Sequence, residues 1–192
     1  GPYAICPVCG HQHRFVRLPL LVVGGVSGAG KSKVCQELVG TLPDVVLLEG
    51  DILWREAFNT PEDNYRDFFE TWLRVAKNIS QAGRPVVLFN AGMAVPENVE
   101  SCIERRYFST VHYLALTCTD EALAERLRRR PAWRESGSPT FIEGQVQFNR
   151  WFRTEARTLT PPVELLDTTT ATAAETAVQV AAWIRHKLDS SV

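Results

Sequence analysis

One octapeptide constrains this chain more than any other feature of its sequence. Residues 25–32 read Gly-Val-Ser-Gly-Ala-Gly-Lys-Ser and fit the pattern G-x-x-x-x-G-K-[ST] at every fixed position. The octapeptide follows an apolar run at 20–24 and opens an amphipathic stretch, so it joins a buried strand to a helix. The sequence therefore predicts a tight turn whose backbone amides converge on an anion.

The residue types of this turn match what a bound triphosphate requires. Glycines let the backbone curl around the anion, and the helix N-terminus adds the positive end of its dipole. Lys31 is expected to reach the β- and γ-phosphates, and the Ser32 hydroxyl to ligate Mg²⁺. A plain glycine turn is the alternative. The predicted nucleotide-binding residues are Gly25, Ser27, Gly28, Ala29, Gly30, Lys31, Ser32 and Lys33.

The rest of the chain alternates short apolar runs with amphipathic stretches. Continuous apolar runs indicate strands buried on both faces, and helical stretches separate them, so the pattern predicts a parallel α/β sheet. The predicted strands are 20–24, 45–49, 85–90, 110–117 and 163–167. The predicted helices are 31–42, 51–58, 61–82, 96–106, 119–130, 141–159 and 172–189, with Thr119 as an N-cap.

Charge and composition exclude several classes of protein. The 192 residues carry 21 basic and 22 acidic side chains, and 45% of the residues are hydrophobic. Such a chain is globular rather than disordered or fibrous, and its net charge of −1 does not draw it to nucleic acid. No apolar run approaches the roughly 20 residues that span a bilayer. Five scattered cysteines favour a reducing compartment, so we expect a cytoplasmic protein.

Four segments, taken in order, resemble the small P-loop kinases, which include nucleoside monophosphate, shikimate and gluconate kinases and antibiotic phosphotransferases. They are the octapeptide, the Glu49-Gly50-Asp51 turn, an arginine-rich segment at 121–134 and Leu-Asp-Thr-Thr at 166–169. The resemblance covers about residues 18–190. It implies a three-layer P-loop sandwich with a five-stranded parallel sheet in the order 2-3-1-4-5, an arginine-rich lid, ATP and Mg²⁺. Residues 18–192 are predicted to form this domain, preceded by a separate segment at 3–17.

The acceptor site is expected beyond the second and third strands, because parallel sheets bind ligands at the carboxyl ends of their strands. Asp51 is expected to orient or deprotonate an acceptor hydroxyl and to hold a water on Mg²⁺, with a helix N-cap as the other role. Glu49 is either a site residue or a strand-end hydrogen-bond partner. Asn90 stands where many P-loop proteins carry an aspartate, so it either binds the acceptor or caps a loop.

Aromatic and basic residues near Asp51 predict a pocket for a flat or anionic small molecule. The resembling monophosphate kinases carry an arginine three residues after such an aspartate, as an anion clamp. Here Arg55 follows Asp51 by four residues, which weakens the monophosphate interpretation. Trp54 is either a stacking platform or a core residue. The predicted acceptor residues also include Tyr65, Arg66 and Phe69.

The segment 121–134 reads EALAERLRRRPAWR and resembles the lid of a small kinase. Planar guanidinium groups suit a transferring phosphoryl group, and lid closure excludes water. Arg126, Arg130 and Arg134 are the predicted phosphate-binding members. A solvated helical face is one alternative, and a nucleic-acid patch, for which aromatic residues are few, is a weaker one.

Two further segments are predicted to approach the site. Gln145, Asn149 and Arg153 form a polar stripe at helical spacing, which is either a solvated face or a contact to the acceptor or lid. Asp167 and Thr168 resemble the adenine-side loop of the small kinases, where backbone groups frame the base. A turn followed by a helix cap is the alternative.

Cys6-Pro7-Val8-Cys9-Gly10 gives half of a zinc site. Two thiolates at this spacing share one tetrahedral metal in zinc ribbons. His11 or His13 is the candidate third ligand, and the fourth would come from elsewhere in the fold or from a second subunit. A knuckle that binds nothing and a redox pair are the alternatives, and a homodimer is left open.

Together these patterns predict an ATP- and Mg²⁺-dependent phosphotransferase with a small-molecule acceptor. Nucleosides or nucleotides are the first choice. A hydroxylated metabolite or antibiotic comes next, followed by the 5′-hydroxyl end of a polynucleotide. A nucleotide-binding regulatory protein with little turnover is the alternative from a different class.

Overall fold

The main sheet has five parallel strands in the order β4-β5-β3-β6-β7, in a computed structural model that describes residues 2–131, 133 and 136–190. In chain order the strands are β3 (Leu20–Gly24), β4 (Val46–Glu49), β5 (Val86–Phe89), β6 (Val111–Thr117) and β7 (Val163–Asp167). The first strand of this sheet lies at its centre, so the predicted order 2-3-1-4-5 and the α/β fold class are confirmed.

The central position of β3 in the sheet explains why the sequence of this strand is apolar throughout. Leu20 pairs in parallel register with Val86 on one side and Val111 on the other, so β3 has no free edge. Leu20, Leu21, Val22 and Val23 expose none of their side-chain surface. Helix layers cover both faces of such a strand, which leaves no position for a polar side chain.

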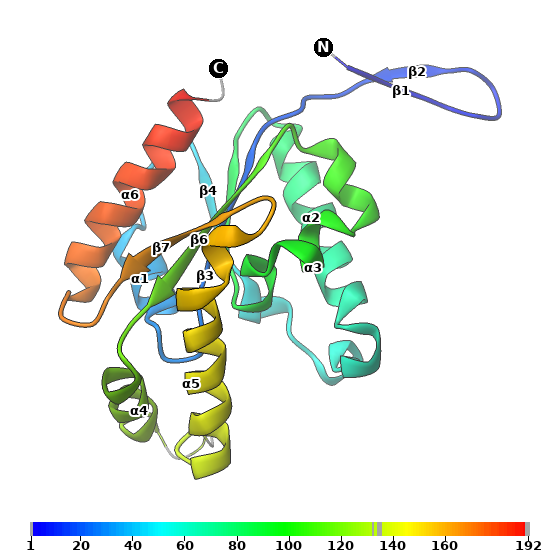
Figure 1. The fold of residues 1–192 in the computed structure, drawn as a ribbon. Coiled ribbons are helices and arrows are strands. Elements are labelled where there is room, and N and C mark those ends of the chain that lie inside the picture. The colour runs from blue at the N-terminus through cyan, green and yellow to red at the C-terminus, as the bar shows by residue number, and fades with distance from the viewer. Residues whose placement is uncertain (1, 132, 134–135, 191–192) are drawn as a thin grey trace.

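Helices lie on both faces of the sheet (Figure 1). α1 (Lys31–Glu37) and α6 (Ala173–Asp189) pack together on one face, and α2 (Arg66–Ser80) and α3 (Pro96–Glu100) lie on the other. α4 (Asp120–Arg128) and α5 (Pro139–Thr154) lie side by side beyond the carboxyl ends of the strands. None of the helices in the described ranges is long and apolar enough to cross a membrane.

Several helices are shorter than the hydrophobic pattern predicts. The expected helix 61–82 begins as α2 only at Arg66, because Asn64 and Tyr65 adopt left-handed backbone with φ of 50° and 58°. Thr119 does cap α4, accepting a hydrogen bond from the Ala122 amide. Short 3₁₀ turns lie in the expected helices 51–58 and 96–106 and at the start of the expected helix 61–82, and others follow β5 and α5. They are η1 (Gly50–Leu53), η2 (Glu56–Phe58), η3 (Pro61–Asp63), η4 (Gly92–Ala94), η5 (Ile103–Tyr107) and η7 (Ala156–Thr158).

A small antiparallel hairpin precedes the main sheet. β1 (Tyr3–Ile5) pairs with β2 (Gln12–Arg14), and the hairpin projects from the body of the molecule (Figure 1). Apart from the half-buried Ala4, the side chains of both strands are exposed. The site described below lies at the carboxyl end of the main sheet.

Candidate active site

The octapeptide forms a cradle between β3 and α1. Gly25, Gly28 and Gly30 all have positive φ angles, of 115°, 90° and 103°. A Cβ atom on Gly25 would lie 2.3 Å from the carbonyl oxygen of Leu116 in β6, so both its conformation and its packing require glycine. The turn is therefore pressed against the sheet, and the N-terminus of α1 follows it directly.

Lys31 lies inside this cradle. Its Nζ donates hydrogen bonds to the carbonyl oxygens of Gly25, at 2.7 Å, and Val26, at 3.0 Å. Burial lowers the pKa of Lys31 from 10.5 to about 8, against the opposing attraction of the Asp51 and Glu49 carboxylates. The ammonium group thus faces two acidic side chains at the place where phosphates would lie.

Ser32 meets an acidic side chain from β4. Its Oγ donates a 2.6 Å hydrogen bond to Oε1 of Glu49. A hydroxyl and a carboxylate oxygen are hard ligands of the kind that Mg²⁺ takes in nucleotide sites, where waters and phosphates complete the shell. The donors present at the start of α1 and the end of β4 therefore fit a magnesium ion.

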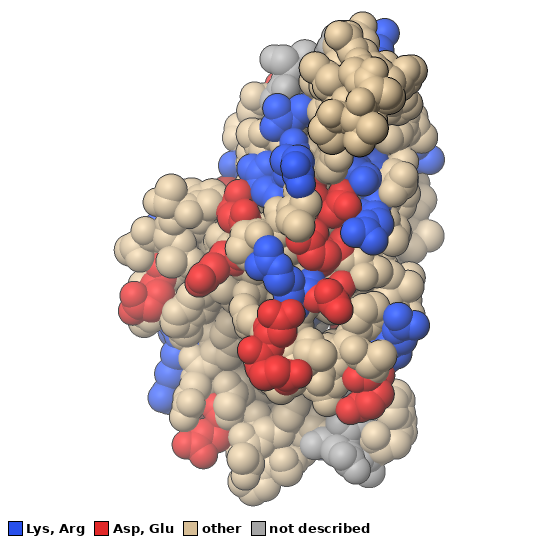
Figure 2. Space-filling view, turned by 90° about the vertical axis from the view of Figure 1, so that its right-hand side faces the viewer, with Lys and Arg blue, Asp and Glu red and all other residues tan. Residues whose placement is uncertain are grey.

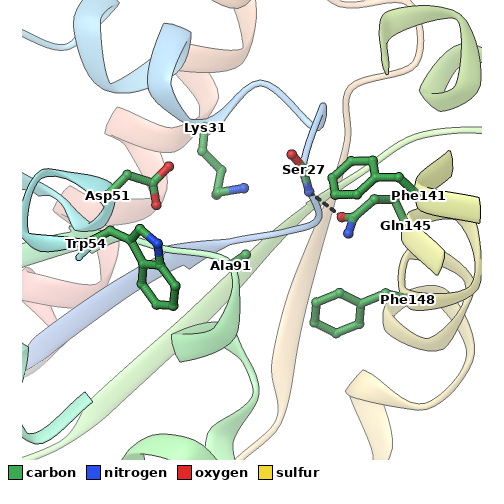
Figure 3. Close-up of a pocket in the computed structure, with 8 residues that line it drawn as sticks. All are labelled: Ser27, Lys31, Asp51, Trp54, Ala91, Phe141, Gln145 and Phe148. Carbon is green, nitrogen blue, oxygen red and sulfur yellow. Dashed lines mark hydrogen bonds between the residues drawn. The ribbon is translucent and has the colours of Figure 1, made fainter. Parts of the chain in front are cut away.

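Asp51 is held next to the cradle by a buried tryptophan. Trp72 of α2 exposes 1% of its surface and donates from Nε1 to the Gly50 carbonyl oxygen, 2.9 Å away. This bond fixes the turn after β4, in which Asp51 is the second residue of the 3₁₀ helix η1. The carboxylate consequently lies in the same pocket as Lys31 (Figure 3).

That pocket has a volume of about 590 Å³ and two unlike ends (Figure 3). Lys31 and Ser27 line its phosphate end, and Asp51 and Trp54 line one wall. The opposite wall comes from α5. The lining side chains are Ser27, Lys31, Asp51, Trp54, Ala91, Phe141, Gln145 and Phe148.

The three arginines predicted for the lid differ in their placement. Arg130 donates from Nη1 to Oγ of Ser27 at 2.7 Å, so its guanidinium reaches the cradle. Arg126 instead binds the loop after β7, donating to the Thr168 hydroxyl at 3.1 Å and to the Thr168 carbonyl oxygen at 2.5 Å. Its predicted contact with phosphate is therefore replaced by a structural one. Arg134 lies outside the described residues.

The loop after β7 is built from its own side chains. Asp167 accepts hydrogen bonds from the amide and hydroxyl of Thr169, at 2.7 and 2.5 Å, and these bonds lower the pKa of Asp167. Thr168 is 3% exposed, and its hydroxyl lies 3.1 Å from the Thr117 carbonyl oxygen. Both side chains therefore shape the loop, and Arg126 also binds the carbonyl oxygens of Thr168 and Thr169.

Several predicted acceptor residues do not line the pocket. The guanidinium of Arg55 lies 4.7 Å from the ring centre of Phe58, and Arg66 donates to the Ser101 carbonyl oxygen at 2.5 Å. Phe69 is 4% exposed and packs under Gly92, where a Cβ would approach the ring to 2.9 Å. Asn90 caps the loop after β5, accepting from the Met93 amide at 3.1 Å. Tyr65 stands behind Trp54, with 6.1 Å between ring centres.

Comparison with known families identifies the chain. The family model described as "AAA domain" matches residues 20–152, which is more than half of the sequence and includes the cradle, Asp51 and α4. The chain belongs to this AAA-domain family. A search of curated proteins found no match.

Solved structures share the fold of this AAA-domain chain. A gluconokinase from Sinorhizobium meliloti 1021 aligns with a TM-score of 0.59 at 21% identity, covering 93% of this chain and 97% of that one. A sugar kinase from Janibacter sp. HTCC2649 gives 0.61 at 17%, covering 88% and 95%. A shikimate kinase from Acinetobacter baumannii, in complex with shikimate, gives 0.54 at 18%, covering 90% and 95%. At these identities the likeness is one of fold.

Three pocket residues of this AAA-domain chain were not predicted. Ala91 follows β5, and Phe141 and Phe148 come from α5. The signal in α5 is the spacing of Phe141, Gln145 and Phe148 at i, i+4 and i+7, which places them on one helix face. Gln145 accepts a hydrogen bond from the Ser27 amide at 2.8 Å, so this face is turned toward the cradle.

The other members of the polar stripe on α5 are structural. Asn149 is fully buried, and its side chain donates to the Cys118 carbonyl oxygen at 2.7 Å and accepts from the Cys118 amide at 3.4 Å. Arg153 lies 3.6 Å from Asp120 of α4. Only Gln145 of the three lines the pocket.

The predicted zinc site on Cys6, Cys9, His11 and His13 is not supported. Hydrogen bonds from the Cys9 amide, the Val8 amide and the Cys9 thiol lower the pKa of Cys6, so the two cysteines do meet in the hairpin turn. The register places His13 opposite Ala4 in the strands, however. No group of three or more His, Cys, Asp or Glu side chains in the described part of the chain would hold a metal ion.

Basic and acidic side chains both occur on the face of the molecule in Figure 2, the basic ones mainly in its upper half and the acidic ones mainly below them. Several basic side chains of the protein are paired with carboxylates. Glu104 pairs with Arg74 at 3.1 Å and with Lys77 at 2.8 Å. Arg105 pairs with Glu100 at 2.8 Å. Phosphates of a polynucleotide would meet neutralised side chains at these pairs.

Proposed function

We propose that this AAA-domain protein is an ATP-dependent phosphotransferase that acts on the hydroxyl of a small metabolite. One observation carries the proposal: the Asp51 carboxylate shares a pocket with Lys31 and Ser27 of the phosphate cradle (Figure 3). A cradle alone would serve any nucleotide-binding protein. A carboxylate beside the cradle, in a cavity of metabolite size, supplies the group that can orient an acceptor hydroxyl and take its proton.

The residues of the cradle would bind the triphosphate. Lys31 gives up its two carbonyl partners for phosphate oxygens, and Arg130, already at Ser27, adds a second positive group. Ser32 and Glu49 would hold Mg²⁺, which when bound would neutralise charge on the phosphates. The loop at 167–169, fixed by Arg126, would frame the adenine.

Asp51 would position the acceptor and take its proton. The acceptor oxygen forms a bond to the γ-phosphorus as the bond to the ADP oxygen breaks, and ADP leaves. The hydroxyl proton passes to the Asp51 carboxylate and then to water. Lys31 lies within electrostatic reach of Asp51. The lysine would hold the γ-phosphate while Asp51 directs the acceptor hydroxyl toward its phosphorus. Nucleosides are the first choice of acceptor, since the Trp54 ring offers a surface for a flat group.

An assay of ADP release from Mg²⁺-ATP, run over a panel of nucleosides, sugars, sugar acids and other hydroxylated compounds, tests the proposal. We expect one acceptor class to stimulate release and to gain a phosphate detectable by mass spectrometry. Lys31→Ala should abolish the stimulation, and Asp51→Asn should lower kcat by about 100-fold or more while leaving ATP binding intact. Stimulation that survives in Asp51→Asn would remove this carboxylate from the mechanism.

A further inference from the structure

We infer that the acceptor is an electrically neutral alcohol carried on a flat, apolar body. The inference rests on the proposed function and narrows it. It excludes anionic acceptors such as nucleotides and sugar acids, which the sequence pattern alone leaves open. It follows from the two aromatic walls of the pocket and from where the neighbouring cations are held.

The first wall is the ring of Trp54, beside Asp51. Trp54 is 46% exposed, yet two rings pack directly against it. Phe68 meets it edge-on with 5.3 Å between ring centres, and Tyr65 lies 6.1 Å away. Phe58 in turn packs against Phe68 at 5.5 Å. A large exposed ring held by other rings is a preformed stacking surface.

The second wall comes from α5 and faces the first across the pocket (Figure 3). Phe148 packs against Phe152, with 4.8 Å between ring centres, and against Trp151 at 5.9 Å. Phe141 lies on the same helix face, nearer the cradle. The amide of Gln145, between these rings, is engaged by the Ser27 backbone. A flat molecule between Trp54 and Phe148 would bury apolar surface on both sides.

Among the described residues, no basic side chain lines the acceptor end of the pocket. Among the described residues that line the pocket, Lys31 alone is basic, and it belongs to the cradle. Arg55 lies against Phe58, Arg66 is bound to Ser101, and Arg130 reaches Ser27 on the phosphate side. The acceptor end instead carries the Asp51 carboxylate, with Glu49 near Lys31. An anionic acceptor would be desolvated beside a negative charge, and the described residues that line the acceptor end offer no guanidinium to pair with it.

Matched pairs of acceptors test the inference in the wild-type protein. Each pair keeps the ring system and the primary hydroxyl but differs by one anionic group: phenylethanediol against 4-(1,2-dihydroxyethyl)benzoate, and adenosine against adenosine 3′-monophosphate. We expect kcat/KM for the neutral member to exceed that of its partner by about tenfold or more. Equal or better use of the anionic members, or of gluconate and shikimate over all neutral compounds, would overturn the inference.

Substitutions in the two aromatic walls test whether these walls bind the acceptor. Trp54→Ala and Phe148→Ala should raise KM for the neutral aromatic acceptor about tenfold, with KM for ATP within about twofold of wild type. Trp54→Phe should restore most of the loss. Trp183→Phe is the matched control, because Trp183 lies on α6 and bonds to Glu164. If neither alanine variant changes KM, the walls do not bind the acceptor and the inference fails.

Equilibrium binding separates this inference from the proposed function. Calorimetry of phenylethanediol and adenosine, with Mg²⁺ and a non-hydrolysable ATP analogue present, needs no turnover. Suppose that the neutral compounds bind, that Trp54→Ala abolishes this binding, and that no acceptor stimulates ADP release. The inference about the class of ligand would then hold, and the proposed phosphotransferase activity would be overturned. Absence of both binding and turnover for the neutral members would overturn the inference itself.

Discussion

Lys31 combines a structural and a functional role in one side chain. Its ammonium donates to the Gly25 and Val26 carbonyl oxygens and so holds the cradle in shape. Phosphate oxygens would compete for the same protons. The pKa of about 8 means that this competition is sensitive to pH near neutrality, which is unusual for a lysine.

We predict that the affinity for Mg²⁺-ATP is nearly constant below about pH 8 and falls above it. A lysine is charged below its pKa, so the ligand-free protein loses the phosphate-binding charge as the pH rises through about 8. The decline should approach tenfold per pH unit, because binding then takes up a proton. Calorimetry in two buffers of different ionisation enthalpy measures both the affinity for Mg²⁺-ATP and the number of protons taken up on binding. Lys31→Arg stays charged and should flatten the profile; an equally steep profile in Lys31→Arg would assign the titration to another group.

Residues of the site differ in how far the sequence alone could predict them. The octapeptide requires glycines, Lys31 and Ser32 at fixed spacing, so a short segment carries the whole signal. Gln145 binds Ser27 across 118 positions of sequence, and Arg66 is taken by Ser101, 35 positions away. No local pattern reports such pairings, since the fold decides which distant partner a polar side chain meets. For that reason the sequence could not show that Arg66, predicted to line the acceptor pocket, bonds to Ser101.

At the scale of elements, Arg126 of α4 and Arg130, two residues beyond its end, bind different partners. Arg126 holds the loop after β7, whereas Arg130 reaches the cradle. The two were predicted as equivalent because the helical spacing puts them on one face. Their partners differ because Arg126 lies beside the loop after β7, whereas Arg130, four residues further along the chain, lies beside the cradle.

We predict that alanine substitutions separate the two roles. Arg126→Ala should lower the free energy of unfolding by about 1–3 kcal/mol and raise KM for ATP, because backbone oxygens of Thr168 and Thr169 lose their donor. Arg130→Ala should lower kcat by about 100-fold with little change in stability. Urea unfolding and steady-state kinetics measure these effects, and Arg128→Ala, an exposed site on the same helix, is the control. Identical phenotypes for both variants would refute the division.

Asn149 joins α5 to the end of β6, and we predict that Asn149→Leu lowers the free energy of unfolding by about 2 kcal/mol or more. The substitution leaves the buried amide and carbonyl of Cys118 without their side-chain partner. Asn78→Leu, exposed on α2, should change stability by less than about 0.5 kcal/mol. Chemical denaturation compares the two. A small effect at Asn149 would mean that α5 is held by its aromatic packing alone.

The strands were easier to predict than the helices for a physical reason. Two of the five, β3 and β7, have the predicted bounds. For the central β3 the reason is burial on both faces, which requires an uninterrupted apolar run. Helix starts depend on single backbone angles. The left-handed Asn64 and Tyr65 interrupt a stretch whose hydrophobic pattern continues from 61 to 82. Neither residue is a glycine, so the sequence carries no strong signal for that turn.

At the scale of the whole molecule, the topology gathers the site. The central β3 delivers the cradle, and its neighbour β5 and the adjacent β4 deliver Ala91 and Asp51 to the same edge. Every strand of the main sheet is parallel to its neighbours, so the carboxyl ends of these five strands share that edge. The order of strands, which the resemblance to small kinases implies, is thus sufficient to bring Asp51 to Lys31. The facing wall requires the lid-side helix α5, whose position the order does not fix.

The hairpin at 3–14 stands apart from this arrangement, and we predict that the chain starting at Phe15 keeps its stability and its activity. The strands of the hairpin are almost wholly exposed. The contacts that anchor this end begin after it: the Phe15 ring lies 5.5 Å from Tyr107, the Val16 amide binds Gln81, and Arg17 donates to Phe108. Removal of residues 1–14 should shift Tm by less than about 2 °C, measured by calorimetry, because little apolar surface is uncovered. Removal of residues 1–17 deletes those anchors and should lower Tm by several degrees. A large loss of Tm in the shorter truncation would show that the hairpin belongs to the folding unit of the main sheet.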